Sequence, residues 1–198
     1  MMRRPLSLWL GFGALVAIAA AARAETTVGT FTLDGLSFVS FQDVEVLQLP
    51  SGSTLRFHFG QPASDGSIPF TLAPEDVEIA PIPMAGAGTL RYSLASPASG
   101  WIRPTANGRR IDFTASVAAS VELPEGGGTF TYAVPFTTES VEARNAIGTA
   151  SVEATGMRMV DGAWYVQLVG ATTNRTNAFP KPGAAVYTVL SGRFDQLP

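Results

Sequence analysis

His58 is the only histidine in the chain and the residue best suited to proton transfer near neutral pH. It lies on the polar side of an alternating segment, Thr54–Phe59. A hydrolase built on His58 would also need an acidic partner and a nucleophile. The sequence contains no Gly-x-Ser-x-Gly motif, the usual nucleophile turn of α/β-hydrolases. We therefore expect His58 to be an exposed or capped strand residue, and the chain not to be an enzyme.

Acidic residues gather in one proline-flanked segment that contains Glu75, Asp76 and Glu78. Asp76 and Glu78 would share one strand face and could offer oxygen ligands to calcium, but no EF-hand spacing supports this. We expect a solvated loop or edge strand instead. Gly126–Gly128 is followed by no helix, so it predicts a hairpin tip rather than a phosphate-binding loop. The chain has no cysteine, which excludes thiolate chemistry and disulfides. No metal and no cofactor are expected.

Aromatic and small apolar residues give the remaining candidates for binding. Trp101 and Tyr165 are the expected surface aromatics, because Trp101 lies in a loop or strand start and Tyr165 points away from the face of Trp164. If the sheet instead encloses a cavity for an apolar ligand, its lining should come from small and flexible side chains. These candidate ligand-binding residues are Ala115, Val117, Ala119, Val134, Met157 and Met159.

Alternation of apolar and polar residues dominates the chain after residue 25, and no window has an apolar stripe of helical period. The longest alternating run extends from Ile111 to Leu123. Turn signals such as Asn107-Gly108 and Asp161-Gly162 separate the runs. This pattern predicts a single all-β domain over residues 25–198. We expect an antiparallel sandwich or partly closed barrel of about eight to ten strands.

Three hairpins can be aligned in the C-terminal half, because facing residues must put apolar side chains on the same side. The first uses Asp161-Gly162 as a two-residue turn, and the others use four-residue loops at 145–148 and 125–128. The expected opposite pairs are Met159 with Trp164, Met157 with Val166, Val141 with Val152, Ala143 with Ala150, Leu123 with Phe130, Val121 with Tyr132 and Ala119 with Val134. Together they predict an antiparallel meander from Arg110 to about Thr173.

The apolar positions of this meander change parity at three places that face one another. The changes fall between Phe136 and Val141, between Ala154 and Met157, and between Leu168 and Val169. We expect the sheet to bend there, so that opposite faces point inward at its two ends. A sheet that is covered on both faces is the alternative explanation.

The first 24 residues predict a secretory signal peptide. Arg3 and Arg4 precede an apolar stretch, and Ala22-Arg23-Ala24 offers a cleavage site before Glu25. Cleavage would remove three of the 13 basic residues and leave 10 against 16 acidic ones. We expect no later transmembrane helix and no nucleic-acid partner, because no long apolar segment and no basic patch follow. The absence of cysteine fits export to the periplasm or the cell exterior.

These observations favour an exported, non-catalytic β-domain of the bacterial cell envelope with a binding or structural role. Its expected partner is an envelope component or another protein. The alternative is a carrier of an apolar small molecule in a β-barrel or sandwich cavity, and a hydrolase that uses His58 comes third. An outer-membrane barrel is disfavoured, because several runs are short, proline is frequent and the last residue is not aromatic.

Overall fold

The computed structural model of the chain describes residues 26–41, 45–84, 88–106, 108–123, 126–144, 149–173 and 185–198. The expected signal peptide lies outside these residues. Within them the chain is almost entirely antiparallel strand, with one short 3₁₀ turn, η1 (Pro74–Asp76). None of the described segments forms a helix with the length and apolar character needed to cross a membrane.

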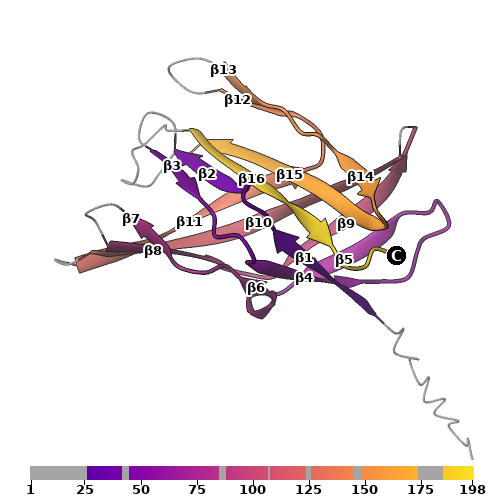
Figure 1. The fold of residues 1–198 in the computed structure, drawn as a ribbon, viewed down its shortest axis with the longest axis horizontal. Helices are drawn as coiled ribbons and strands as arrows, with labels where there is room; N and C mark the ends of the chain where they lie inside the picture. The colour runs from indigo at the N-terminus through magenta and orange to yellow at the C-terminus, as the bar shows by residue number, and fades with distance from the viewer. Residues whose placement is uncertain are drawn as a thin grey trace, which may run out of the picture.

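Eight antiparallel strands form a closed barrel (Figure 1). They are β1 (Thr27–Leu33), β4 (Thr54–Phe59), β5 (Ile68–Leu72), β9 (Ala98–Thr105), β10 (Gly108–Leu123), β11 (Gly126–Thr137), β15 (Ala163–Thr173) and β16 (Ala185–Phe194). The order round the barrel is β15-β11-β10-β9-β5-β4-β1-β16, and pairing of β16 with β15 closes the ring. The all-β prediction is confirmed, and the barrel closes completely.

Further strands extend from the barrel. They are β2 (Phe38–Phe41), β3 (Glu45–Gln48), β6 (Val77–Glu78), β7 (Ile82–Met84), β8 (Gly88–Leu94), β12 (Val141–Arg144), β13 (Thr149–Val152) and β14 (Met157–Val160). The hairpin β2–β3 pairs with β16, β8 pairs with the second half of β10, and β14 pairs with β15. The hairpin β12–β13 is a separate two-stranded sheet, which lies outside the barrel beside β15 (Figure 1).

Aromatic side chains fill the barrel because the alternation sends every second residue inward. On β4, Leu55, Phe57 and Phe59 are buried, whereas Arg56 between them is exposed. The ring of Phe57 lies 5.1 Å from that of Phe70 on β5 and 5.2 Å from that of Phe194 on β16. An eight-stranded barrel is just wide enough for its side chains to fill it. Its interior is therefore a packed core.

Two of the three expected hairpins have the predicted register. Met159 pairs with Trp164, and Val141 pairs with Val152. The third register is wrong, because Ala119 lies opposite Phe130 instead of Val134. Pairing of β10 with β11 continues until Leu123 faces Gly126, so only two residues join the strands. The glycines that were expected in a loop are part of β11, and the partners shift by four residues.

The continuous meander expected from Arg110 to Thr173 is interrupted, because β11 pairs directly with β15 and, within the part of the chain that the structure describes, the hairpin β12–β13 forms a sheet of its own. The ladder between β15 and β16 has no break, yet Leu168 and Val169 are both fully buried on opposite faces of β15. Tyr187 of β16 packs in a second apolar cluster with Val152 of the hairpin. The parity change on β15 therefore coincides with burial of both faces, which was the alternative explanation.

The first and last strands of the barrel are neighbours. Phe31 of β1 lies opposite Phe194 of β16, and the two strands are antiparallel. Two hydrogen bonds extend this pairing, from the Asp195 amide to the Thr30 carbonyl (3.1 Å) and from the Thr30 amide to the Asp195 carboxylate (2.7 Å). The chain therefore enters β1 and leaves β16 at the same end of the barrel.

Candidate functional site

A groove of about 690 Å³ lies on the outer face of β9, β10 and β11, with β12 at its rim. The pairing of these strands brings Trp101, Asp112 and Thr137 into one row across the sheet. A second row contains Ser99, Thr114 and Pro135. Val141 and Glu142 of β12 also line the groove. Its size falls within the range of roughly 300–1,000 Å³ that is typical of ligand pockets.

Trp101 supplies the aromatic surface of the groove. Its side chain points outward because Gly100 and Ile102, its neighbours on β9, occupy the inner face. Trp101 is 40% exposed, which is unusual for so large an apolar side chain. The guanidinium carbon of Arg103 lies over the ring, 6.0 Å from its centroid. This cation–π contact orients the indole and leaves much of it accessible to a ligand.

The carboxylate of Asp112 is already fully engaged beside Trp101. One oxygen accepts a hydrogen bond from the Thr137 hydroxyl at 2.8 Å, and the other accepts one from Arg110 Nε at 2.7 Å. Arg103 lies 3.8 Å from the second oxygen. Hydrogen bonds to Glu139 and to Asp112 raise the pKa of the Arg110 guanidinium. The network fixes the floor of the groove and gives Asp112 a positioning role.

A second polar cluster surrounds His58 on the outer face of β4. Its Nε2 lies 3.0 Å from the carboxylate of Asp76, which also accepts a hydrogen bond from the Ala73 amide at 3.0 Å. Arg56 lies 3.6 Å from the other oxygen. Asp76 is buried, so the expectation of a wholly solvated acidic segment is wrong at this residue. The turn η1 places it against β4, while Glu78 remains exposed.

The His58 cluster has the acidic partner that a hydrolase requires, but it lies outside the cavities described here. Neither His58 nor Asp76 lines the groove or the barrel interior. Burial alone would raise the pKa of Asp76, but the hydrogen bonds from His58 and Ala73 and the charges of His58 and Arg56 outweigh it and lower that pKa. Among the described residues, no group of three or more potential His, Cys, Asp or Glu ligands could hold a metal ion. The cluster is arranged as a network in which the buried carboxylate of Asp76 contacts the side chains of His58 and Arg56.

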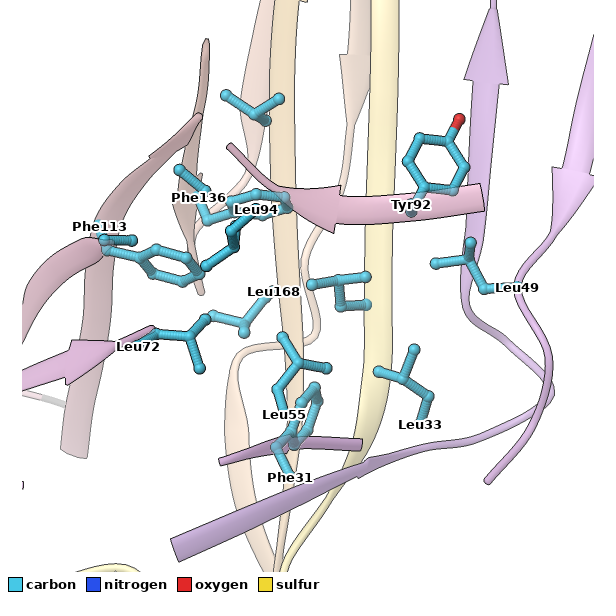
Figure 2. Close-up of a cluster of buried hydrophobic side chains, with 14 of the residues drawn as sticks. Phe31, Leu33, Leu49, Leu55, Leu72, Tyr92, Leu94, Phe113, Phe136 and Leu168 are labelled. Carbon is cyan, nitrogen blue, oxygen red and sulfur yellow. The ribbon is translucent and has the colours of Figure 1, made fainter. Parts of the chain in front are cut away.

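The barrel interior contains a small apolar cavity of about 50 Å³. Figure 2 shows the core side chains that converge near it, with the hydroxyl of Tyr92 directed away from Leu55 and Phe31. Burial raises the pKa of Tyr92, and Tyr132 raises it further. The cavity is far smaller than the roughly 300 Å³ of a small ligand pocket.

The structure does not bring the six candidate ligand-binding residues together. Ala115 and Val117 line the interior cavity, whereas Ala119 and Val134 are fully packed in the core. Met157 is half-buried against the core. Met159 is 58% exposed. They were grouped through the expected meander, and both the shifted register of β11 and the position of β14 at the sheet edge separate them.

The two aromatic candidates also lie apart. Trp101 lies in the groove, but Tyr165 is half-buried and lines a shallow depression beside Arg193 and Gly192. Sequence reasoning missed the partners of Trp101, namely Arg103, Asp112 and Thr137. The Asn107-Gly108 turn signal indicates that β9 and β10 are neighbours, but a two-residue turn at these residues would set Trp101 opposite Thr114. In the structure Thr105 lies opposite Gly108, and Trp101 therefore lies opposite Asp112.

The fold and the groove define a closed antiparallel β-barrel with an aromatic groove on its outer surface. No family model, no curated protein and no solved structure matches this chain.

Proposed function

We propose that this chain is an exported, non-catalytic binding domain of the bacterial cell envelope and that the groove around Trp101 is its binding surface. The observation that carries the proposal is the groove itself. It combines a ligand-sized volume with an exposed indole that Arg103 orients. Exposed aromatic side chains on a rigid strand are typical of binding surfaces, because little conformational entropy is lost when they are covered.

The contacts of the ionisable side chains support the proposal that the domain is not catalytic. Asp112 is occupied by Thr137 and two arginines, and His58 pairs with Asp76 away from the groove. General acid–base catalysis needs such groups within reach of a bound substrate. Export is supported by the arginine-containing leader and by its Ala22-Arg23-Ala24 sequence.

The experiment is co-sedimentation of the mature chain with envelopes isolated from the bacterium that encodes it. We expect the chain to pellet with the envelopes and Trp101→Ala to remain largely in the supernatant. The matched control is Leu36→Ala, which removes an apolar side chain that is 67% exposed and does not line the groove. Circular dichroism of each variant checks that the barrel is folded.

Two outcomes would overturn the proposal. One is a wild-type chain that stays in the supernatant. The other is Trp101→Ala that pellets as well as the wild type. Mass spectrometry of the protein purified from its native host tests export separately, since we expect Glu25 as the first residue.

A further inference from the structure

We infer that the groove binds a neutral oligosaccharide, one sugar ring of which stacks on Trp101. This inference rests on the proposed function and names the chemical class of its ligand. Four features of the groove carry it: the exposed indole, the hydroxyl-bearing side chains beside it, the balance of charge and the position of the groove within the sheet.

The indole of Trp101 matches the apolar face of a sugar ring. The face of an aromatic ring carries partial negative charge, and the C–H groups on one side of a pyranose carry partial positive charge. The Arg103 guanidinium over the ring restricts its rotation. A sugar that stacks on Trp101 therefore meets a surface that is already oriented, which lowers the entropy cost of binding.

Polar side chains next to Trp101 suit a ligand rich in hydroxyl groups. Ser99 and Thr114 are exposed and lie opposite each other on β9 and β10, in the row next to Trp101. Both hydroxyls can donate and accept hydrogen bonds, as sugar hydroxyls do. Glu142 at the rim is exposed and offers acceptors. Arg103 offers donors from a side chain that is 48% exposed.

The charges around the groove disfavour an anionic ligand. One basic side chain, Arg103, and two acidic ones, Asp112 and Glu142, line it, and Arg103 and Arg110 are both directed at Asp112. The whole chain also has a formal net charge of −3. A polyanion such as a nucleic acid or a uronic acid polymer would need an excess of positive charge.

The position of the groove disfavours an extended peptide. Peptides that add to a sheet use the free backbone groups of an edge strand. The floor of this groove consists of β9, β10 and β11, which all lie within the barrel sheet, and β11 pairs with β15 at Phe136 and Thr137. The groove therefore lies over the face of paired strands rather than along a free edge, so side chains provide most of the contacts.

The experiment is calorimetric titration of the mature chain with four neutral hexasaccharides: cellohexaose, maltohexaose, laminarihexaose and fully N-acetylated chitohexaose. Tetragalacturonic acid and a proline-rich peptide serve as an anionic and a peptidic comparison. We expect at least one neutral hexasaccharide to bind. We expect Trp101→Ala to weaken that binding by about fivefold or more, because the indole supplies the main apolar contact to the sugar ring. Trp101→Phe should retain part of the affinity, and Leu36→Ala all of it.

Several results would overturn the inference. Binding of a hexasaccharide that is equally tight in Trp101→Ala would contradict it, as would preferential binding of the anionic or peptidic ligand. If all four hexasaccharides fail while envelope binding still depends on Trp101, the ligand class is wrong and the proposed function stands. If envelope binding also fails, both are wrong.

Discussion

The carboxylate of Asp76 connects the polar residues around His58. Its oxygens are shared among the Ala73 amide, His58 and Arg56, and little of its side chain meets solvent. Desolvation favours the protonated form, yet these partners favour the charged form more strongly and lower the pKa below its ordinary value of 3.8. Ionised Asp76 therefore stabilises the folded chain.

We predict that Asp76→Asn destabilises the protein at pH 7. Because the pKa is lowered in the folded state, the stabilisation is fully present above the unfolded value of 3.8 and is lost as the pH falls through the folded value. The expected loss at pH 7 is about 1–3 kcal/mol, the cost of disrupting a hydrogen-bonded charged group. Urea unfolding of wild type and variant between pH 7 and pH 3 measures it, and the difference should shrink in acid.

The control for this prediction is Glu78→Gln. Glu78 lies 3.5 Å from Arg56 but its side chain is 67% exposed. Exposed ion pairs contribute little, so the free energy of unfolding should change by less than about 0.5 kcal/mol. An Asp76→Asn variant that is as stable as the wild type at pH 7, or a difference that grows between pH 4 and pH 3, would contradict the role of Asp76.

At this scale the sequence predicted types of residue better than their partners. The exposure of Trp101 was expected, because its flanking Ser99-Gly100 indicated a loop or strand start. The pairing of His58 with Asp76 was not, because β6 and the turn η1 must first fold back against β4. A single sequence contains no signal for a contact that depends on such long-range pairing.

At the scale of strands, alternation determines which face a residue occupies but not which partner it has. A shift of four residues between β10 and β11 leaves every apolar residue on its predicted face, so the parity test accepts both registers. Glycine composition suggested a loop at Gly126–Gly128. Instead, Gly127 lies opposite Glu122 within the ladder, where a side chain on Gly127 would collide with the Val121 carbonyl.

Engineered disulfides distinguish the two registers of β10 and β11, and the natural chain has no cysteine to interfere. Ser120 lies opposite Thr129, and their hydroxyl oxygens are 2.8 Å apart. We predict that Ser120→Cys with Thr129→Cys forms a disulfide on mild oxidation. Ser120→Cys with Ala133→Cys, the pair that the four-residue loop would align, should stay reduced. Mass spectrometry under non-reducing conditions reports the result, and cross-linking of the second pair alone would show the register to be wrong.

At the scale of the whole molecule, β16 is the most enclosed strand of the barrel. Residues 185–192 are buried without interruption, because the core covers one face and the second apolar cluster covers part of the other. β16 also pairs with β1, β2 and β15. The hairpin β12–β13 has only its own two strands as hydrogen-bonded partners among the described residues.

We predict that amide hydrogen exchange separates these two regions. A two-stranded hairpin is marginally stable alone, so the amides of β12 and β13 should exchange through local opening. The amides of β16 should exchange only when the barrel unfolds. Exchange followed by mass spectrometry measures both, with β4 as an internal reference for the barrel. Protection of β12–β13 equal to that of β16 would contradict the description of the hairpin as a separate sheet.

Closure of the barrel could not be predicted from the sequence because, like the contact of His58 with Asp76, it depends on pairing between segments that are distant along the chain. The alternation of apolar and polar residues predicted strands and an all-β fold. The turn signal Asp161-Gly162 predicted the register of its hairpin correctly. The pairing of β1 with β16 joins residues at opposite ends of the chain, and that of β5 with β9 also joins distant segments. No local pattern indicates such neighbours.

The adjacency of β1 and β16 also determines how the barrel responds to mechanical load. Tension applied at Thr27 and at Asp195 acts at one end of the antiparallel pair β1–β16, so the two strands separate from that end, one residue pair after another. The hydrogen bonds between Thr30 and Asp195 bear the load first. The hydrogen bonds between the following residue pairs of β1 and β16 then break one at a time, because they do not bear the load together. A pull on both ends therefore opens the barrel wall at low force, along the seam between its first and last strands.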